Sequence, residues 1–215
     1  MVFKNQKKIG VVVGLEREKE VLSSKSNLFV ESGFGEKAYN AAKKVLRHNV
    51  DLIVSFGLAG SMSRKLKNSQ IIIPNVVLSD GLKSKKISKL SNNYFKKKSR
   101  EKIISDMKLL TSEKILNKNS KISKIDAVDM EAGFVLKAAN EHKIPFTSIK
   151  VIFDDLDNPI PDFLVTSINK NGELNILNLM FEIFKNPFRI RSLLEMNKVY
   201  KKSMHKLKKL ASELF

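Results

Sequence analysis

Carboxylates mark both ends of one stretch of the sequence, residues 127–157. An Asp-Met-Glu triplet at 129–131 precedes an amphipathic segment, and Asp154 and Asp155 end the apolar run that follows it. Carboxyl groups can give or take a proton when they are positioned beside a reacting bond. In an open α/β sheet, ligands bind beyond the carboxyl ends of the strands, so Asp154 is the first candidate for chemistry.

The elements that must position these acids can be predicted from hydrophobic spacing. Val135, Ala138 and Ala139 recur at three- and four-residue steps, which predicts a helix, and Pro145 ends the connection that follows. Residues 146–153 form a short β-branched and aromatic run that is typical of a buried strand. The acids therefore lie at the two ends of one αβ unit.

A second group of acids follows the first predicted strand. Residues 9–15 (IGVVVGL) form an apolar run that ends at Gly14, and the charged segment 16–20, which contains Glu18, comes directly after it. This strand also brings carboxylates to its carboxyl end.

Glycine turns separate the next predicted elements. A short strand at 27–31 leads to Ser-Gly-Phe-Gly at 32–35, which opens a helix over about 36–48. Such a turn presents free N–H groups to an anion or a sugar, although a Gly-x-Gly pair alone is more often only a tight turn. A third strand at 51–55 ends in the small residues of FGLAGS at 56–61, which allow a ligand to approach the backbone.

Elements of several kinds are expected over residues 70–128. Residues 70–78, with Pro74 inside them, predict a bent or edge strand. Residues 83–100 carry eight basic and no acidic side chains, which favours a flexible solvated loop over a lid or a surface for an anionic partner. A short helix is expected at 102–110 and a strand at 122–128.

The C-terminal region is predicted to be helical, at 174–184 and again at 188–215. The last segment is strongly basic, and such helices usually pack on their own domain. The alternative is peripheral contact with an anionic membrane, through an apolar set on this segment that comprises Leu193, Leu194, Met196, Val199 and Tyr200. The fold class predicted is therefore α/β, one domain with a central mixed sheet flanked by helices: residues 1–157 form the core, and 158–215 form a helical extension packed on it.

Composition limits the class of protein further. The chain has 215 residues, is 42% hydrophobic and has a net charge of +18. This charge attracts polyanions, but it can equally reflect a general preference of the source genome for lysine. No cysteine and only three dispersed histidines make a metal site improbable, and favour the cytoplasm. No segment approaches the ~20 apolar residues of a membrane span. A nucleic-acid-binding protein is an alternative, but no recognition motif supports it.

Four blocks resemble the nucleoside phosphorylase and nucleosidase superfamily, in the same order. They are IGVVVGLEREKEV, SGFGEKAYNAAKKVL, DLIVSFGLAGSM and AVDMEAGFVLKAANEHKIPFTSIKVIFDDLD, which cover most of residues 9–157. The ending, NPIPDFLVTSINKNGELNILNLMFEIFKNPFRIRSLLEMNKVY, is similar to the hopanoid-associated nucleosidases within that superfamily.

The resemblance implies a role for individual residues. Cleavage of a purine N-glycosidic bond needs an acid for the leaving base, and Asp154 matches that acid. Glu18 matches the residue that activates the attacking water, and Glu131 the acceptor of ribose hydroxyls. Other expected substrate contacts are Met130, which packs against the sugar, with Gly33, Gly57, Ala59 and Phe153.

Two departures from the superfamily affect the activity expected. No arginine precedes the third-strand glycines, and Lys37 is the cation nearest to the glycine turn, so hydrolysis is favoured over phosphorolysis. Phe153 stands where relatives carry a small polar residue.

The resemblance implies a homodimer without a cofactor that releases adenine from adenosylhopane. Methylthioadenosine or adenosylhomocysteine hydrolysis, or a phosphorylase, are the alternatives.

Replacement of the expected acid tests this assignment. Asp154→Asn should fold normally and lose roughly 10²–10⁴-fold in turnover, because the amide cannot protonate the leaving base. Adenine release measured on the purified variant, with circular dichroism to check its fold, gives the answer. A variant that releases adenine at the wild-type rate would exclude Asp154 as the acid.

Overall fold

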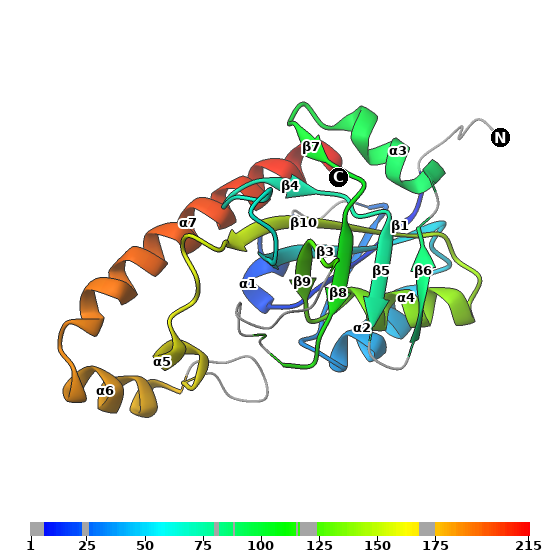
Figure 1. Cartoon of the computed structure of the whole chain (residues 1–215). Coiled ribbons are helices and arrows are strands. Elements are labelled where there is room, and N and C mark those ends of the chain that lie inside the picture. The colour runs from blue at the N-terminus through cyan, green and yellow to red at the C-terminus, as the bar shows by residue number, and fades with distance from the viewer. Residues whose placement is uncertain are drawn as a thin grey trace.

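The computed structural model describes residues 7–22, 26–79, 82–87, 89–114, 116, 124–167 and 175–215. Within these ranges, ten strands form one curled mixed sheet, and helices cover both of its faces (Figure 1). The predicted fold class, α/β with a central mixed sheet flanked by helices and a helical C-terminal extension, is confirmed.

The strands are β1 (Ile9–Val13), β2 (Leu28–Ser32), β3 (Leu52–Ser61), β4 (Ile71–Ile72), β5 (Val76–Ser79), β6 (Leu82–Lys86), β7 (Ile103–Ile104), β8 (Lys108–Thr111), β9 (Ala127–Asp129) and β10 (Phe146–Asp154). The helices are α1 (Glu16–Lys19), α2 (Lys37–Leu46), α3 (Lys89–Lys98), α4 (Ala132–Glu141), α5 (Asp162–Val165), α6 (Ile176–Lys185) and α7 (Arg189–Leu214).

Strand β3 is the centre of the sheet. Its first half lies between β1 and β10, parallel to both, and β2 continues the parallel set beyond β1. Its far end pairs antiparallel with β9, through Gly60 and Val128 and through Ser61 and Ala127. The carboxyl end of β9 therefore lies near the carboxyl ends of β3 and β10, where the predicted acids are.

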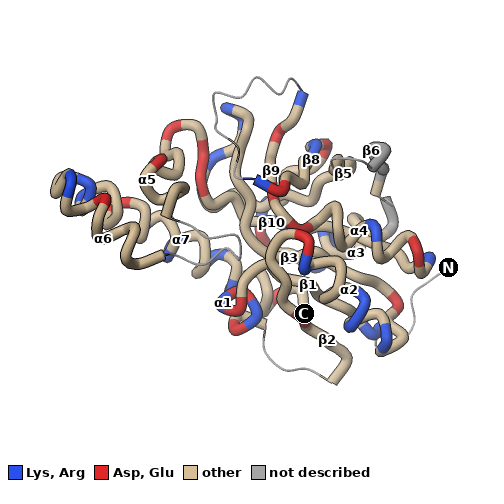
Figure 2. Tube along the Cα trace, turned by 90° about the horizontal axis from the view of Figure 1, so that it is seen from below, with Lys and Arg blue, Asp and Glu red and all other residues tan. Residues whose placement is uncertain are grey.

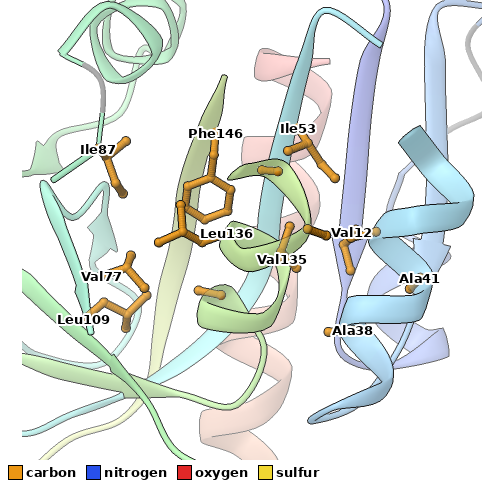
Figure 3. Packing of buried hydrophobic residues seen from close by; sticks show 14 of the residues in the cluster. Val12, Ala38, Ala41, Ile53, Val77, Ile87, Leu109, Val135, Leu136 and Phe146 are labelled. Atoms are coloured by element: carbon orange, nitrogen blue, oxygen red, sulfur yellow. The ribbon is translucent and has the colours of Figure 1, made fainter. Parts of the chain in front are cut away.

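The apolar strand runs follow from burial on both faces of the sheet. Side chains alternate between the faces along a strand, so Val12 packs with α2 and α4, whereas Val11 and Val13 pack with α3 and α7. Figure 3 shows the first of these layers, in which Val12 lies between Ala38 of α2 and Val135 of α4.

Helix α7 joins the sheet to a hairpin that stands away from it (Figure 1). Its C-terminal half is buried against β1, β3 and β10. Its other end packs with α5 and α6 around a small separate cluster that includes Phe163, Leu164 and Leu179. None of the helices in the described ranges is both long and apolar enough to cross a bilayer.

Two sequence predictions were wrong. Residues 83–100 are not a flexible loop: they contain most of β6 and all of α3, which the fully buried Phe95 holds to the core. The lysines at 96–98 lie in the last turn of α3, where the helix dipole favours them. Residues 102–110 do not form a helix, because Asp106 adopts a positive φ of 65° and makes a turn between β7 and β8.

Two other expected strands are present in part. The strand expected at 70–78 is two strands, β4 and β5, which Pro74 separates. The strand expected at 122–128 is shorter: β9 begins at Ala127, residues 124–126 precede it without strand structure, and residues 122 and 123 lie outside the described part. The Asn-Gly pair at 171–172, part of the resembling C-terminal block, also lies outside it.

The buried half of α7 can be tested by deleting core methyl groups. Leu207 is fully buried, so Leu207→Ala should lower the free energy of unfolding by about 2–5 kcal/mol. The neighbouring Lys208 is exposed, and Lys208→Ala should change it by less than about 0.5 kcal/mol. Urea unfolding followed by circular dichroism measures both. Equal effects would show that α7 is not packed as described.

Candidate active site

A cavity of about 230 Å³ opens where β3, β9 and β10 end. Its walls come from the loop after β1 and α1, the turn before α2, the second half of β3, the segment after β8, β9 with the residues before α4, the end of β10 with Ile160, and α7. The lining residues are Gly14, Leu15, Glu18, Phe34, Leu58, Ala59, Gly60, Met62, Lys114, Leu116, Val128, Asp129, Met130, Glu131, Phe153, Asp154, Ile160 and Tyr200.

Glu18 is a buried carboxylate held by three backbone donors. Its Oε2 accepts from the N–H groups of Gly14 (2.9 Å) and Leu15 (3.0 Å), and its Oε1 accepts from that of Leu58 (2.9 Å). Gly57 has a φ of +152°, and a Cβ at this position would lie 2.7 Å from Glu18 Oε1. The short helix α1 and the glycine of β3 together fix this carboxylate at the cavity wall.

Asp129 closes the junction between β9 and α4. Its Oδ1 accepts from the Thr111 hydroxyl (2.7 Å), and its Oδ2 accepts from the Ala132 N–H (2.9 Å). The same Thr111 oxygen accepts from Gly133 N–H (2.7 Å). Two N–H groups of the first turn of α4 are satisfied in this way, which holds the neighbouring Glu131 in place.

Lys150 is the cation of this group, and its side chain is only 1% exposed. Its Nζ lies 2.8 Å from Asp129 Oδ2 and 3.8 Å from Glu131 Oε2. Lys150 was not among the site residues predicted from the sequence. Its position inside an apolar strand run could have indicated it, because a buried ammonium group requires an anionic partner.

The charges of the group shift one another's pKa values. Burial lowers the pKa of Lys150, but the charges of Asp129 and Glu131 outweigh burial, so its pKa is raised and it stays protonated. Burial raises the pKa of Glu131 to about 8, against the opposing effect of Lys150 and of a hydrogen bond from Gly35 N–H. Burial also raises the pKa of Glu18, again opposed by Lys150. The charge of Lys150 thus interacts with three carboxylates, those of Asp129, Glu131 and Glu18.

The two acids at the end of β10 have different surroundings. Asp154 lines the cavity, and a Cβ on Gly60 would lie 2.8 Å from its Oδ1. Asp155 instead accepts hydrogen bonds from the N–H groups of Asn68 (2.8 Å), Asp157 (3.0 Å) and Asn158 (2.9 Å). Asp155 therefore holds the turn after β10 and does not line the cavity.

Most of the residues that the sequence singled out lie around this one cavity. Glu18, Ala59, Met130, Glu131, Phe153 and Asp154 all line it. Gly57 and Gly33 do not: Gly57 lies behind Glu18, and a Cβ on Gly33 would lie 2.6 Å from the Lys37 carbonyl oxygen, so Gly33 serves the turn that opens α2. Phe34 lines the cavity in its place.

Helix α7 contributes a wall that the sequence did not reveal. The ring of Tyr200 meets that of Phe153 edge to face, with centroids 5.9 Å apart, and Arg17 hydrogen-bonds to its hydroxyl. Burial raises the pKa of this tyrosine. Nothing in the local sequence around residue 200 distinguishes a cavity residue from an ordinary position of an amphipathic helix.

Comparison with known proteins finds a similar sequence and similar folds. No family profile matches the chain. A 5′-methylthioadenosine/S-adenosylhomocysteine nucleosidase of Buchnera aphidicola subsp. Baizongia pistaciae is 26% identical over 87% of the chain and 95% of that protein. The fold matches a nucleosidase of the same description from Colwellia psychrerythraea in complex with adenine, with a TM-score of 0.61, 19% identity, and coverage of 83% of this chain and 96% of that one. It also matches futalosine hydrolase of Helicobacter pylori, with a TM-score of 0.63, 15% identity, and coverage of 97% and 98%.

In sequence and in fold, the chain is therefore similar to proteins that are described as nucleosidases. The fold itself is the one that these nucleosidases share.

The buried cation predicts a specific change in pH dependence. A carboxylate that accepts a proton must first be ionised, so activity should rise with pH through the raised pKa values of Glu131 and Glu18. Lys150→Met removes the charge that favours the ionised forms, so both pKa values should rise further. The acidic limb of the kcat/KM profile should then move to higher pH.

Lys150→Arg is the matched control, because it keeps the charge and should keep the wild-type limb. Breaking a buried ion pair costs about 3–5 kcal/mol, so thermal unfolding of each variant must be measured beside the profile. A folded Lys150→Met variant with an unshifted acidic limb would contradict the electrostatic role.

Proposed function

We propose that this protein is a nucleosidase of the nucleoside phosphorylase and nucleosidase superfamily, and that it hydrolyses adenosine derivatives with an apolar 5′ substituent, of the methylthioadenosine class, and releases adenine. The observation that carries the proposal is one cavity lined by Asp154 and, in the wall formed by β3, α1 and α4, by the buried acids Glu18 and Glu131. The relative from Buchnera and the adenine-bound neighbour support the substrate class.

Asp154 is proposed as the general acid. As the bond from C1′ to the purine nitrogen breaks, negative charge develops on the base, and a proton from Asp154 to the purine N7 neutralises it. Glu131 is proposed to accept hydrogen bonds from the ribose hydroxyls, and Met130 to pack against the sugar. Both side chains line the same cavity as Asp154, which supports the assignment.

Glu18 is proposed to accept the proton of the attacking water. The water oxygen bonds to C1′ as the base leaves, and its proton passes to the Glu18 carboxylate. Burial has already raised the pKa of Glu18, which makes it a better proton acceptor than an exposed glutamate. The Gly14, Leu15 and Leu58 N–H groups would keep the carboxylate in position throughout.

The charge of this wall favours water over phosphate as the nucleophile. The cation beside Glu18 and Glu131 is Lys150, whose Nζ is already 2.8 Å from Asp129 Oδ2, and Lys114 is the cation among the residues that line the cavity. A phosphate dianion placed here would meet carboxylates in a poorly solvated site, where repulsion between like charges is strong. The absence of an arginine before the β3 glycines supports the same conclusion.

Adenosylhopane is a second candidate substrate, and one observation favours it. The apolar part of the cavity wall includes Ile160, which also packs in the cluster under α6 with Phe163 and Leu179. A bulky apolar 5′ group that left the cavity past Ile160 would meet the hairpin of α6 and α7. The resemblance of the C-terminal block to hopanoid-associated nucleosidases supports this candidate as well.

The decisive test is adenine release from methylthioadenosine, adenosylhomocysteine and adenosylhopane, each with and without phosphate. We expect hydrolysis at a rate independent of phosphate, and a loss of roughly 10²–10⁴-fold in Glu18→Gln, which cannot accept the proton. Glu16→Gln, an exposed neighbour on α1, is the matched control. Formation of the 5-substituted ribose 1-phosphate would show a phosphorylase, and release from none of the three compounds would refute the proposal.

A further inference from the structure

The hairpin formed by α6 and the beginning of α7 carries an exposed apolar surface. Within the described ranges, every large hydrophobic side chain that is strongly exposed lies between residues 176 and 194. Phe184 is 86% exposed and Phe188 is 87% exposed. We call this set the hairpin surface; it comprises Ile176, Leu177, Met180, Phe181, Phe184, Phe188, Ile190 and Leu194.

Helix α6 is apolar on two faces, and the hairpin core uses only one of them. Leu179 and Ile183 point inward and pack with α5 and α7. Leu177, Met180, Phe181 and Phe184 follow one another at steps of three, one and three residues, so they form a separate stripe on the outer face. A contiguous exposed apolar stripe of this kind marks a site of interaction with another surface.

Basic side chains surround this stripe. Residues 175–202 contain six Lys or Arg and two Glu, a net charge of +4. Glu182 is paired with both Arg189 and Lys185, and Glu195 is paired with Arg191 at 3.2 Å. Lys185 also lies over the Phe181 ring, at 4.3 Å from its centroid. Figure 2 shows Lys and Arg at the outer end of the hairpin, where α6 meets α7.

The sequence had suggested a different apolar set for contact with a membrane, on α7 itself. The structure turns most of that set inward: Leu193 and Met196 pack in the hairpin core, and Tyr200 lines the cavity. Of the five residues expected there, only Leu194 is strongly exposed. The surface available for docking is therefore the outer face of α6 with the first turns of α7.

We propose that the hairpin surface docks on an anionic lipid bilayer. Phenylalanine and leucine side chains beside basic ones suit the boundary between headgroups and acyl chains. A second copy of this chain fits less well, because a twofold contact would bring two segments of net charge +4, on chains of net charge +18, toward each other. An anionic surface turns the same charge into attraction.

Docking would place the cavity beside the bilayer. Ile160 belongs both to the cavity wall and to the hairpin core, and Tyr200 lies on the helix that forms the second arm of the hairpin. An amphiphilic nucleoside could then reach the cavity from the membrane. The docking proposal itself does not depend on the proposed function, because its test measures binding without turnover.

The test is cosedimentation of the full-length protein with vesicles. We expect binding to phosphatidylcholine vesicles that contain phosphatidylglycerol, release by high salt, and no binding to phosphatidylcholine alone. Lys185→Gln with Arg191→Gln should lower the partition coefficient about 30-fold, at ~1 kcal/mol for each charge. Lys43→Gln with Arg47→Gln, at exposed positions on α2 and at its C-cap, removes the same charge elsewhere and should have little effect.

Insertion of the apolar stripe can be observed directly, because the chain contains no tryptophan. The fluorescence of Phe184→Trp should shift to the blue with anionic vesicles, whereas His48→Trp, at an exposed site after α2, should not respond. Equal binding to neutral vesicles, or an unshifted Phe184→Trp, would overturn the proposal. Dimerisation that Phe184→Ser abolishes, measured by sedimentation velocity, would assign the surface to a second copy instead.

Discussion

The ammonium group of Lys150 inside the sheet is the constraint on which the site depends. A buried lysine is tolerated only when its charge is paired, and Asp129, 2.8 Å away, supplies the partner. Lys150 belongs to β10 and Asp129 ends β9, so the pair joins two strands that each border β3. Because Asp129 also accepts from Ala132 N–H, the start of α4, and with it Glu131, is fixed to the same point.

The parallel part of the fold could be predicted because its local signals agree with its tertiary environment. Strand β1 is buried on both faces, so its apolar run is uninterrupted, and α2 begins directly after a glycine turn. Residues 83–110 were predicted wrongly for the opposite reason. The two-residue strand β7 and the strand β8 exist because β4 and β5 pair with them, and such pairing leaves no periodicity in so short a segment.

The candidate site was predictable only in part, for a similar reason. Glu18, Glu131 and Asp154 could be predicted because each lies at or near the carboxyl end of a predicted strand. The four sequence blocks that resemble the superfamily, in the same order, support the same three residues. Lys150 and Tyr200 reach the site through tertiary packing, one from inside a strand and the other from a helix 46 residues after Asp154. Their importance depends on what lies opposite them in space, and no local pattern expresses that.

Helix α7 belongs both to the cavity wall and to the hairpin. Its 26 residues span about 39 Å, and its C-terminal part is locked in the core by Leu207 and Leu210, while its first turns lie under α6. Tyr200 lies between these two parts. A helix without an internal proline or glycine transmits displacement along its axis rather than absorbing it at a kink. One continuous helix therefore connects the hairpin to Tyr200 and, through the edge-to-face ring contact, to Phe153 beside the proposed acid.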